Sequence, residues 1–131
     1  VNYLQYYYLK LNKLNVKFEN TRANFNLIKS ISLLKRKLSN NNGSCLFVAN
    51  WSVSEMPLKL RAEILKYVAN TNYILLSFQD RFENIDNMKY FKKIKTNLEQ
   101  RNFIVKIFPL KHYNNALFNT NKHYYLFAKK T

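Results

Sequence analysis

The sequence predicts an α/β domain whose sheet is largely parallel. Apolar residues at three- and four-residue spacing, typical of amphipathic helices, alternate along the 131 residues with short continuous apolar runs. Such runs are typical of strands buried on both faces, as in a parallel sheet. The last two runs have no helical segment between them, so we expect an antiparallel C-terminal strand. The length suits a single domain over residues 1–131.

The individual elements follow from these two patterns. Helical spacing covers residues 2–14 and 25–38, residues 16–18 predict a short strand, and residues 39–44 are the clearest loop. Ser52 and Glu55 then have the spacing of a capping box, whereas Pro57 suits a first helical turn, so two starts remain open for the next helix. Apolar runs and helical spacing place the other elements as follows: strands at residues 45–49, 73–78, 103–108 and 124–127, and helices at about 58–69 and 86–101.

The composition excludes several kinds of site. A single glycine, Gly43, leaves no Gly-rich loop that could hold a nucleotide pyrophosphate. His112 and His123 lie eleven residues apart without a cysteine partner, so the spacing of metal ligands is absent. Cys45 is the single cysteine and excludes an internal disulfide, which together with the lack of a signal peptide indicates a cytoplasmic location. No apolar run approaches the roughly 18 residues of a membrane span.

The net charge of +15 favours an anionic partner when it is considered alone. Seventeen of the 22 basic residues are lysines, however, and they are dispersed along the chain. Arginine is the better ligand for phosphate oxygens and base edges. We therefore expect a solvated basic exterior without a specific nucleic-acid partner, and a small basic nucleic-acid-binding module is the alternative.

Polar residues follow three of the predicted strands, at the edge of an open α/β sheet where ligands bind. A lone tryptophan among polar groups suits a small-molecule cleft, and a histidine in a loop suits proton transfer. We expect the functional site in these loops. The candidate residues are Asn50, Trp51, Glu55, Asp80, Arg81 and His112.

Most of these candidates also have a purely structural interpretation. Glu55 could complete a helix capping box instead of acting as a base. Trp51 could cover the core, and Asp80 and Arg81 could form a local ion pair of little energetic weight. His123 alternates with the core residues of the last strand, so we expect it to be structural.

A resemblance to a known family rests on an apolar strand, a Trp-Ser-x-Ser-Glu turn and a helix that carries an arginine. Together these features resemble bacterial S-adenosylmethionine-dependent methyltransferases that are described as sugar O-methyltransferases. The similarity extends over roughly the whole chain, and the turn is its specific part. The residues are Leu46-Phe47-Val48-Ala49-Asn50-Trp51-Ser52-Val53-Ser54-Glu55-Met56-Pro57 and Arg61, with Gln79, Phe82, Ile85-Asp86-Asn87 and Tyr124-Tyr125-Leu126-Phe127 in further agreement.

The resemblance implies a Rossmann-like methyltransferase sheet with the strand order 3-2-1-4-5-7-6, in which strand 7 is antiparallel. This chain would supply strands 4 to 7, with strand 3 at residues 16–18. In the family, a Gly-rich loop after strand 1 and an acidic residue after strand 2 hold the cofactor, and neither has a counterpart here. The chain begins with Val1 and resembles the C-terminal half of such an enzyme.

For the site, the resemblance and the loop positions imply methyl transfer from S-adenosylmethionine to a hydroxyl of a small molecule, a sugar or a glycan precursor. Glu55 or His112 would accept the hydroxyl proton. The competing interpretations are the nucleic-acid-binding module and an interaction fragment without activity. Four residues would line the substrate or the adenosine: Asn50, Trp51, Asp80 and Arg81.

Overall fold

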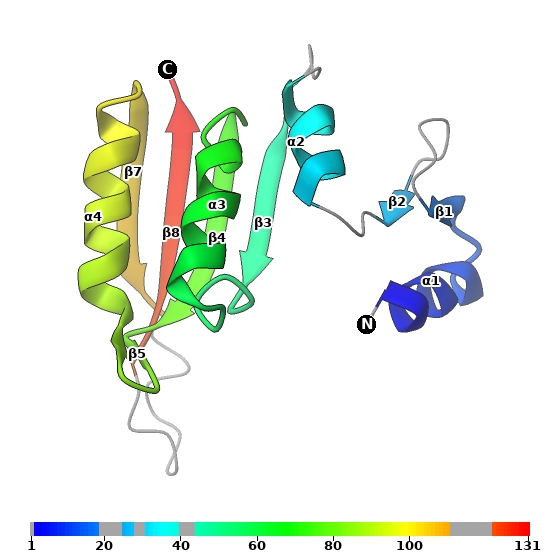
Figure 1. The fold of residues 1–131 in the computed structure, drawn as a ribbon, viewed down its shortest axis with the longest axis horizontal. Coiled ribbons are helices and arrows are strands. Elements are labelled where there is room, and N and C mark those ends of the chain that lie inside the picture. The colour runs from blue at the N-terminus through cyan, green and yellow to red at the C-terminus, as the bar shows by residue number, and fades with distance from the viewer. Residues whose placement is uncertain (1, 19–24, 28–30, 40–43, 111–121) are drawn as a thin grey trace. The chain divides into compact units, whose positions relative to one another are not determined.

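The computed structural model describes residues 2–18, 25–27, 31–39, 44–110 and 122–131 (Figure 1). They belong to two compact units, Val1–Asn40 and Asn41–Thr131. The described part of the first unit contains a two-stranded sheet, and that of the second contains a four-stranded sheet and a short hairpin.

The first unit contains helix α1, strands β1 and β2, and helix α2. The predicted strand at residues 16–18 is confirmed as β1, which pairs in parallel with β2. The prediction of one helix over residues 25–38 is wrong in its first part, because the residues of β2 form a ladder with β1 instead of helical hydrogen bonds. The bounds are α1 (Asn2–Leu11), β1 (Val16–Phe18), β2 (Phe25–Leu27) and α2 (Ile31–Ser39).

Helix α1 ends before the predicted boundary at residue 14. Lys13 adopts a left-handed conformation with φ 57°. The N–H groups of Lys13 and Leu14 donate back to the carbonyl oxygens of Lys10 and Leu9 at 2.9 and 3.1 Å. This pattern closes the last helical turn and redirects the chain toward β1.

The second unit is built on a four-stranded sheet with the order β3-β4-β8-β7. Strand β3 pairs in parallel with β4, and β8 is antiparallel to both of its neighbours. The antiparallel C-terminal strand is therefore confirmed. Three strands share one direction, but two of the three ladders are antiparallel because β8 lies between β4 and β7. The bounds are β3 (Leu46–Asn50), β4 (Tyr73–Gln79), β7 (Phe103–Pro109) and β8 (His123–Lys130).

Helices α3 (Leu58–Val68) and α4 (Asn87–Glu99) lie on one face of this sheet (Figure 1). Their apolar stripes and the facing strand residues form the core, in which the rings of Phe78 and Phe91 are in contact, with centroids 4.2 Å apart and planes inclined by 31°. No helix in the described ranges has both the length and the apolarity that a membrane span requires. The most deeply buried apolar residues of the core are Val68, Ile74, Leu76, Phe78, Phe91, Leu126 and Ala128.

The starts of the two helices differ from each other in how they are capped. Pro57 is the N-cap of α3, and no side chain caps this helix, so the Ser52–Glu55 capping box is wrong. Asp86 caps α4 by accepting a hydrogen bond from the N–H of Lys89 at 2.8 Å. A hairpin of β5 (Arg81–Phe82) and β6 (Ile85–Asp86), which the sequence did not predict, leads into α4.

The opposite face of the four-stranded sheet exposes large apolar side chains. Leu46 and Val48 on β3 are 54% and 50% exposed, so the prediction that this strand is buried on both faces is wrong. The strand pairing places the members of this group in cross-strand rows on one side. We call this side the open face and define it by Leu46, Val48, Ile104, Phe108 and Phe127.

Candidate functional site

A small cavity of about 180 Å³ lies where β3 and β4 end. Asn50 and Ser77 lie side by side in the β3–β4 ladder, and their side-chain oxygens are 3.3 Å apart in a hydrogen bond that the Ser77 hydroxyl donates. The rings of Trp51 and His123 are in contact, with centroids 5.7 Å apart and planes inclined by 60°. The cavity is lined by Asn50, Trp51, Ser77, Leu110, His123, Tyr124 and Tyr125. Two of the predicted site residues, Asn50 and Trp51, are therefore brought together.

The backbone at Trp51 is held in an unfavourable conformation. Its φ of 55° lies in the left-handed region, which costs a residue with a side chain about 1–2 kcal/mol. Three hydrogen bonds fix this turn: the Trp51 N–H donates to the Ser77 carbonyl at 2.9 Å, and the Trp51 carbonyl accepts from the Ser54 hydroxyl at 2.7 Å and from the Glu55 N–H at 3.1 Å. The indole position is thus set by the backbone of residues 51–55.

Arg61 secures the rest of this loop from inside the protein. Its side chain is fully buried, and it donates from Nε to the Met56 carbonyl at 2.6 Å and from a terminal nitrogen to the Ser54 carbonyl. The other terminal nitrogen donates to Oδ1 of Asn87 at 2.6 Å. Asn87 in turn donates from Nδ2 to the Ser54 carbonyl at 3.3 Å, so one side-chain pair connects the loop to the start of α4.

Tyr90 completes the surroundings of Arg61. The guanidinium carbon lies 5.4 Å from the centroid of the Tyr90 ring. Burial lowers the pKa of Arg61, an effect that Tyr90 partly offsets. Burial likewise raises the pKa of Tyr90, which the charge of Arg61 partly offsets. Neutral oxygens of Met56, Ser54 and Asn87 hold this guanidinium in place.

Glu55 is exposed and does not line the cavity. Its N–H donates to Trp51, and α3 starts without a side-chain cap, so the capping interpretation of its carboxylate is excluded. Glu55 belongs to the loop whose Ser54 and Met56 carbonyls accept hydrogen bonds from Arg61.

Asp80 and Arg81 lie at the end of β4 but do not line the cavity. The Asp80 carboxylate accepts from the Lys122 N–H at 3.1 Å, and its carbonyl accepts from the N–H groups of Asn87 and Met88 at 2.8 and 3.2 Å. Asp80 thus joins the starts of β8 and α4. Arg81 is exposed on β5. His112 lies outside the described residues.

Two residues of the site region were not singled out for it from the sequence. His123 was expected to be structural, and it is buried, but it also lines the cavity against Trp51. The signal was the strand order implied by the family resemblance, in which the antiparallel last strand lies beside strand 5, so that its first residues lie beside the carboxyl end of β4. Arg61 was named as part of the family pattern but not as a site residue; the signal for its role is a charged residue within the apolar stripe of α3.

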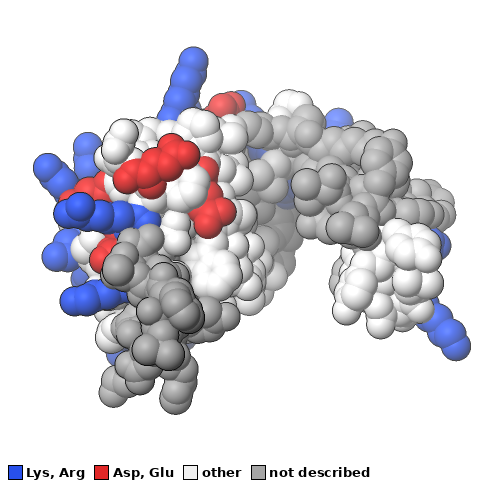
Figure 2. Space-filling model, turned by 90° about the horizontal axis from the view of Figure 1, so that it is seen from below, with Lys and Arg blue, Asp and Glu red and all other residues white. Residues whose placement is uncertain are grey.

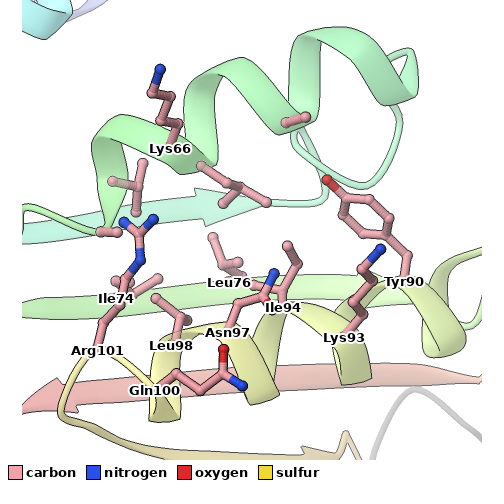
Figure 3. Close-up of a pocket in the computed structure, with 14 residues that line it drawn as sticks. Lys66, Ile74, Leu76, Tyr90, Lys93, Ile94, Asn97, Leu98, Gln100 and Arg101 are labelled. Atoms are coloured by element: carbon pink, nitrogen blue, oxygen red, sulfur yellow. The ribbon is translucent and has the colours of Figure 1, made fainter.

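A larger cavity of about 710 Å³ lies between α3 and α4 (Figure 3). Its apolar lining includes Leu76 and Leu98, which are almost fully buried. Figure 3 shows Lys93, Asn97 and Arg101 on the α4 side of the cavity, with their side chains directed toward α3. No acidic residue lines it, and none of its lining residues lies at the carboxyl end of β3 or β4, so we place the candidate site at the smaller cavity.

Neither the distribution of charged side chains nor a group of metal-binding side chains indicates another site in the described part of the chain. Basic and acidic side chains both lie on the face shown in Figure 2. Within the described ranges, no three His, Cys, Asp or Glu side chains are grouped to hold a metal ion. Comparison with family models, curated proteins and solved structures finds no significant match for the chain. The geometry of the sheet edge is therefore the basis for an inference about function.

Proposed function

We propose that the chain is the C-terminal half of an S-adenosylmethionine-dependent O-methyltransferase that acts on a small molecule, a sugar or a glycan precursor. The observation that carries this proposal is the order β3-β4-β8-β7 with β8 antiparallel. It corresponds to strands 4-5-7-6 of the order that the family resemblance implies. The correspondence extends over all four strands of this sheet, and the described strands of the first unit are not part of it.

The site loop supports the same assignment. The Trp-Ser-x-Ser-Glu turn follows β3 directly, at the sheet edge where ligands of open α/β proteins bind. The arginine that completes the family pattern, Arg61, binds the carbonyl of Ser54 in this turn. The sequence pattern thus has a physical basis, since its members are in contact.

The residues present form one wall of a cofactor site and not the whole of it. The cavity of about 180 Å³ is smaller than the roughly 300–1,000 Å³ of ligand pockets. In this proposal S-adenosylmethionine supplies the methyl group, and its binding loop belongs to the other half of the enzyme. Asn50 and Trp51 line the wall that faces the acceptor or the adenosine.

Glu55 is the residue to which we assign proton removal from the acceptor hydroxyl. A carboxylate on an ordered loop at the sheet edge can take the proton that the oxygen releases as it gains the methyl group. In the completed enzyme, Glu55→Gln is expected to lower kcat by about 10²–10⁴-fold, the usual contribution of a general base, with an unchanged melting temperature. Glu63→Gln, an exposed glutamate on α3, is the control. Near-normal turnover of Glu55→Gln would reassign the base, and His112→Asn then tests the remaining candidate.

The decisive experiment compares the chain with a longer protein that is expressed from the same coding sequence extended upstream. Calorimetric titration should show S-adenosylmethionine binding by the longer protein and none by the 131-residue chain. The longer protein should transfer a labelled methyl group to sugar hydroxyls. Micromolar cofactor binding by the chain alone, or an upstream region without a Gly-rich loop, would contradict the proposal.

A further inference from the structure

The cavity of about 710 Å³ between α3 and α4 is large enough to hold a small molecule. Its volume falls within the roughly 300–1,000 Å³ that is usual for ligand pockets. Short side chains explain why the two helices leave this space. Ala62 and Ala69 lie about two helical turns apart on the wall that α3 contributes, and alanine has no atoms beyond Cβ that could fill the gap.

The inner surface of this cavity is apolar. Ile74 and Leu76 of β4 form its floor, and each is 1% exposed. Leu65 of α3 and Leu98 of α4 are buried in its walls, and Tyr90 lies at one end (Figure 3). A ligand that fills the cavity therefore needs an apolar body.

Two cations lie at the end of the cavity that is opposite to Tyr90 (Figure 3). Both helices run from the carboxyl ends of the parallel strands back to their amino ends, so their C-termini lie at the same end of the sheet (Figure 1). Lys66 belongs to the last turn of α3, and Arg101 follows the end of α4 by two residues. This end of the cavity is at the amino ends of β4 and β7, whereas the candidate site is at the carboxyl ends of β3 and β4.

The charged residues that line the cavity are all basic. Lys66, Lys93 and Arg101 are exposed at its rim, and none of them forms an ion pair with another described residue. Cations also stabilise the last turn of a helix, but that role requires no apolar cavity between them. The guanidinium of Arg101 can bind a carboxylate through two parallel hydrogen bonds. An apolar interior with unpaired cations at one end is complementary to an amphipathic anion.

We propose that this cavity binds a single-chain carboxylate of medium length, which is the chemistry of a fatty acid. The alkyl chain lies on the floor formed by Ile74 and Leu76 and extends toward Tyr90. The carboxylate accepts hydrogen bonds from Arg101, and Lys66 contributes a second positive charge. The inference does not depend on the methyltransferase proposal, because the carboxylate lies at the opposite end of the sheet from the candidate site.

The test is equilibrium dialysis of radiolabelled octanoate against the full chain at low micromolar concentration. The chain should bind octanoate at a single site. Unlabelled octanol and octylamine should compete at least about tenfold more weakly than unlabelled octanoate, because they lack the charge-assisted hydrogen bonds to Arg101. Hexanoate should bind more weakly than octanoate and decanoate more tightly, because each buried methylene adds to the affinity.

Three substitutions locate the ligand. Arg101→Gln should lower the affinity for octanoate by at least about tenfold. Lys89→Gln is the matched control, since Lys89 is an exposed lysine of α4 that does not line the cavity, and it should leave the affinity unchanged. Ala62→Leu should also weaken binding, because the larger side chain occupies part of the cavity. Its melting temperature should not fall, since filling a cavity commonly stabilises a protein, so this variant tests the cavity without altering a charge.

Three results would overturn the inference. Equal binding of octanol and octanoate would exclude recognition of the carboxylate. Equal weakening by Arg101→Gln and Lys89→Gln would assign the affinity to the net charge of +15. Binding that Ala62→Leu leaves intact would place octanoate outside the cavity. Titration with S-adenosylmethionine is unaffected by these outcomes, so the two proposals can fail separately.

Discussion

Arg61 is a fully buried cation whose hydrogen-bond partners are neutral oxygens. Burying such a charge is costly unless each donor finds an acceptor, and the loop supplies two carbonyls while Asn87 supplies a third oxygen. The interaction is therefore expected to fix the loop more than to strengthen the core. Removing Arg61 leaves the Met56 carbonyl and the Asn87 side-chain oxygen without this donor, whereas the Ser54 carbonyl keeps its hydrogen bond from Asn87.

Replacing Arg61 by Met should consequently lower the free energy of unfolding by about 2–4 kcal/mol. Lys59→Met removes the same charge from an exposed position of the same helix and should stay within about 0.5 kcal/mol of the parent. Urea unfolding followed by circular dichroism measures both. A loss below about 1 kcal/mol for Arg61→Met would show that the loop reorganises around the missing side chain.

Tyr90 gives a pH-dependent prediction. Its hydroxyl is buried and has no hydrogen-bond partner among the described residues, and burial raises its pKa above the ordinary value of 10.0. As the pH rises, the unfolded chain therefore loses the phenolic proton before the folded chain does. The contribution of this group to stability is present below about pH 10 and is lost as the pH rises through the folded-state pKa.

Tyr90→Phe should remove this alkaline loss. Because it deletes an unpaired buried hydroxyl, the free energy of unfolding at pH 7 should be unchanged or higher by up to about 1 kcal/mol. Urea unfolding at several pH values between neutral and alkaline gives the difference between variant and parent, which should grow in favour of the variant above pH 10. Tyr8→Phe, at a tyrosine that is 66% exposed, is the control. A difference that is independent of pH would contradict the assignment.

At the scale of elements, the apolar runs were sufficient to locate the four strands of the larger sheet. They could not decide which faces are covered, because Leu46 and Val48 have the same residue types as buried strand residues. The segment that forms β2 was assigned to a helix because Phe25 and Ile28 also fit helical spacing. Strands β5 and β6 have two residues each, too few to show any period.

The difference between local sequence patterns and long-range pairing also explains which residues of the site could be predicted. Asn50 and Trp51 could be predicted because they follow an apolar run directly, and the edge of a parallel sheet is a general ligand position. His123 depends on the insertion of β8 between β4 and β7, which is a long-range pairing without a local signal. The hydrogen bond from Arg61 to Asn87 likewise joins residues that are 26 positions apart.

Strand β3 leads to a prediction about association. It lies at one end of the sheet among the described strands, and such an edge exposes unpaired backbone groups that can pair with another chain. The chain by itself is therefore expected to self-associate increasingly with concentration. Leu46→Lys should suppress this association, because an edge lysine opposes strand pairing, whereas Phe127→Lys, at an open-face residue of the inner strand β8, should not. Sedimentation velocity distinguishes the two, and identical profiles for the parent and Leu46→Lys would exclude the edge as the cause.

At the scale of the whole molecule, the net charge of +15 is the property that most resembles a nucleic-acid-binding protein. The largest group of basic residues in the second unit is on α4, at Lys89, Lys92, Lys93 and Lys95. Lys95 forms an i,i+4 ion pair with Glu99 at 2.6 Å. Lysines of this kind attract phosphates electrostatically but offer no bidentate contact that reads a base edge.

Binding to an oligonucleotide is therefore expected to be weak and independent of sequence. The dissociation constant should be on the order of 10⁻⁴ to 10⁻⁶ M at physiological salt and should rise steeply as salt is added, because phosphate contacts release counterions. Lys89→Ala/Lys92→Ala should reduce the slope of log K against log salt by about one per lost phosphate contact. Lys59→Ala, which lies on α3, serves as the control for charge alone. Anisotropy titrations with two unrelated sequences measure these quantities. Submicromolar and sequence-dependent binding at about 200 mM salt would favour the nucleic-acid-binding module over the methyltransferase, since dispersed lysines cannot supply such affinity.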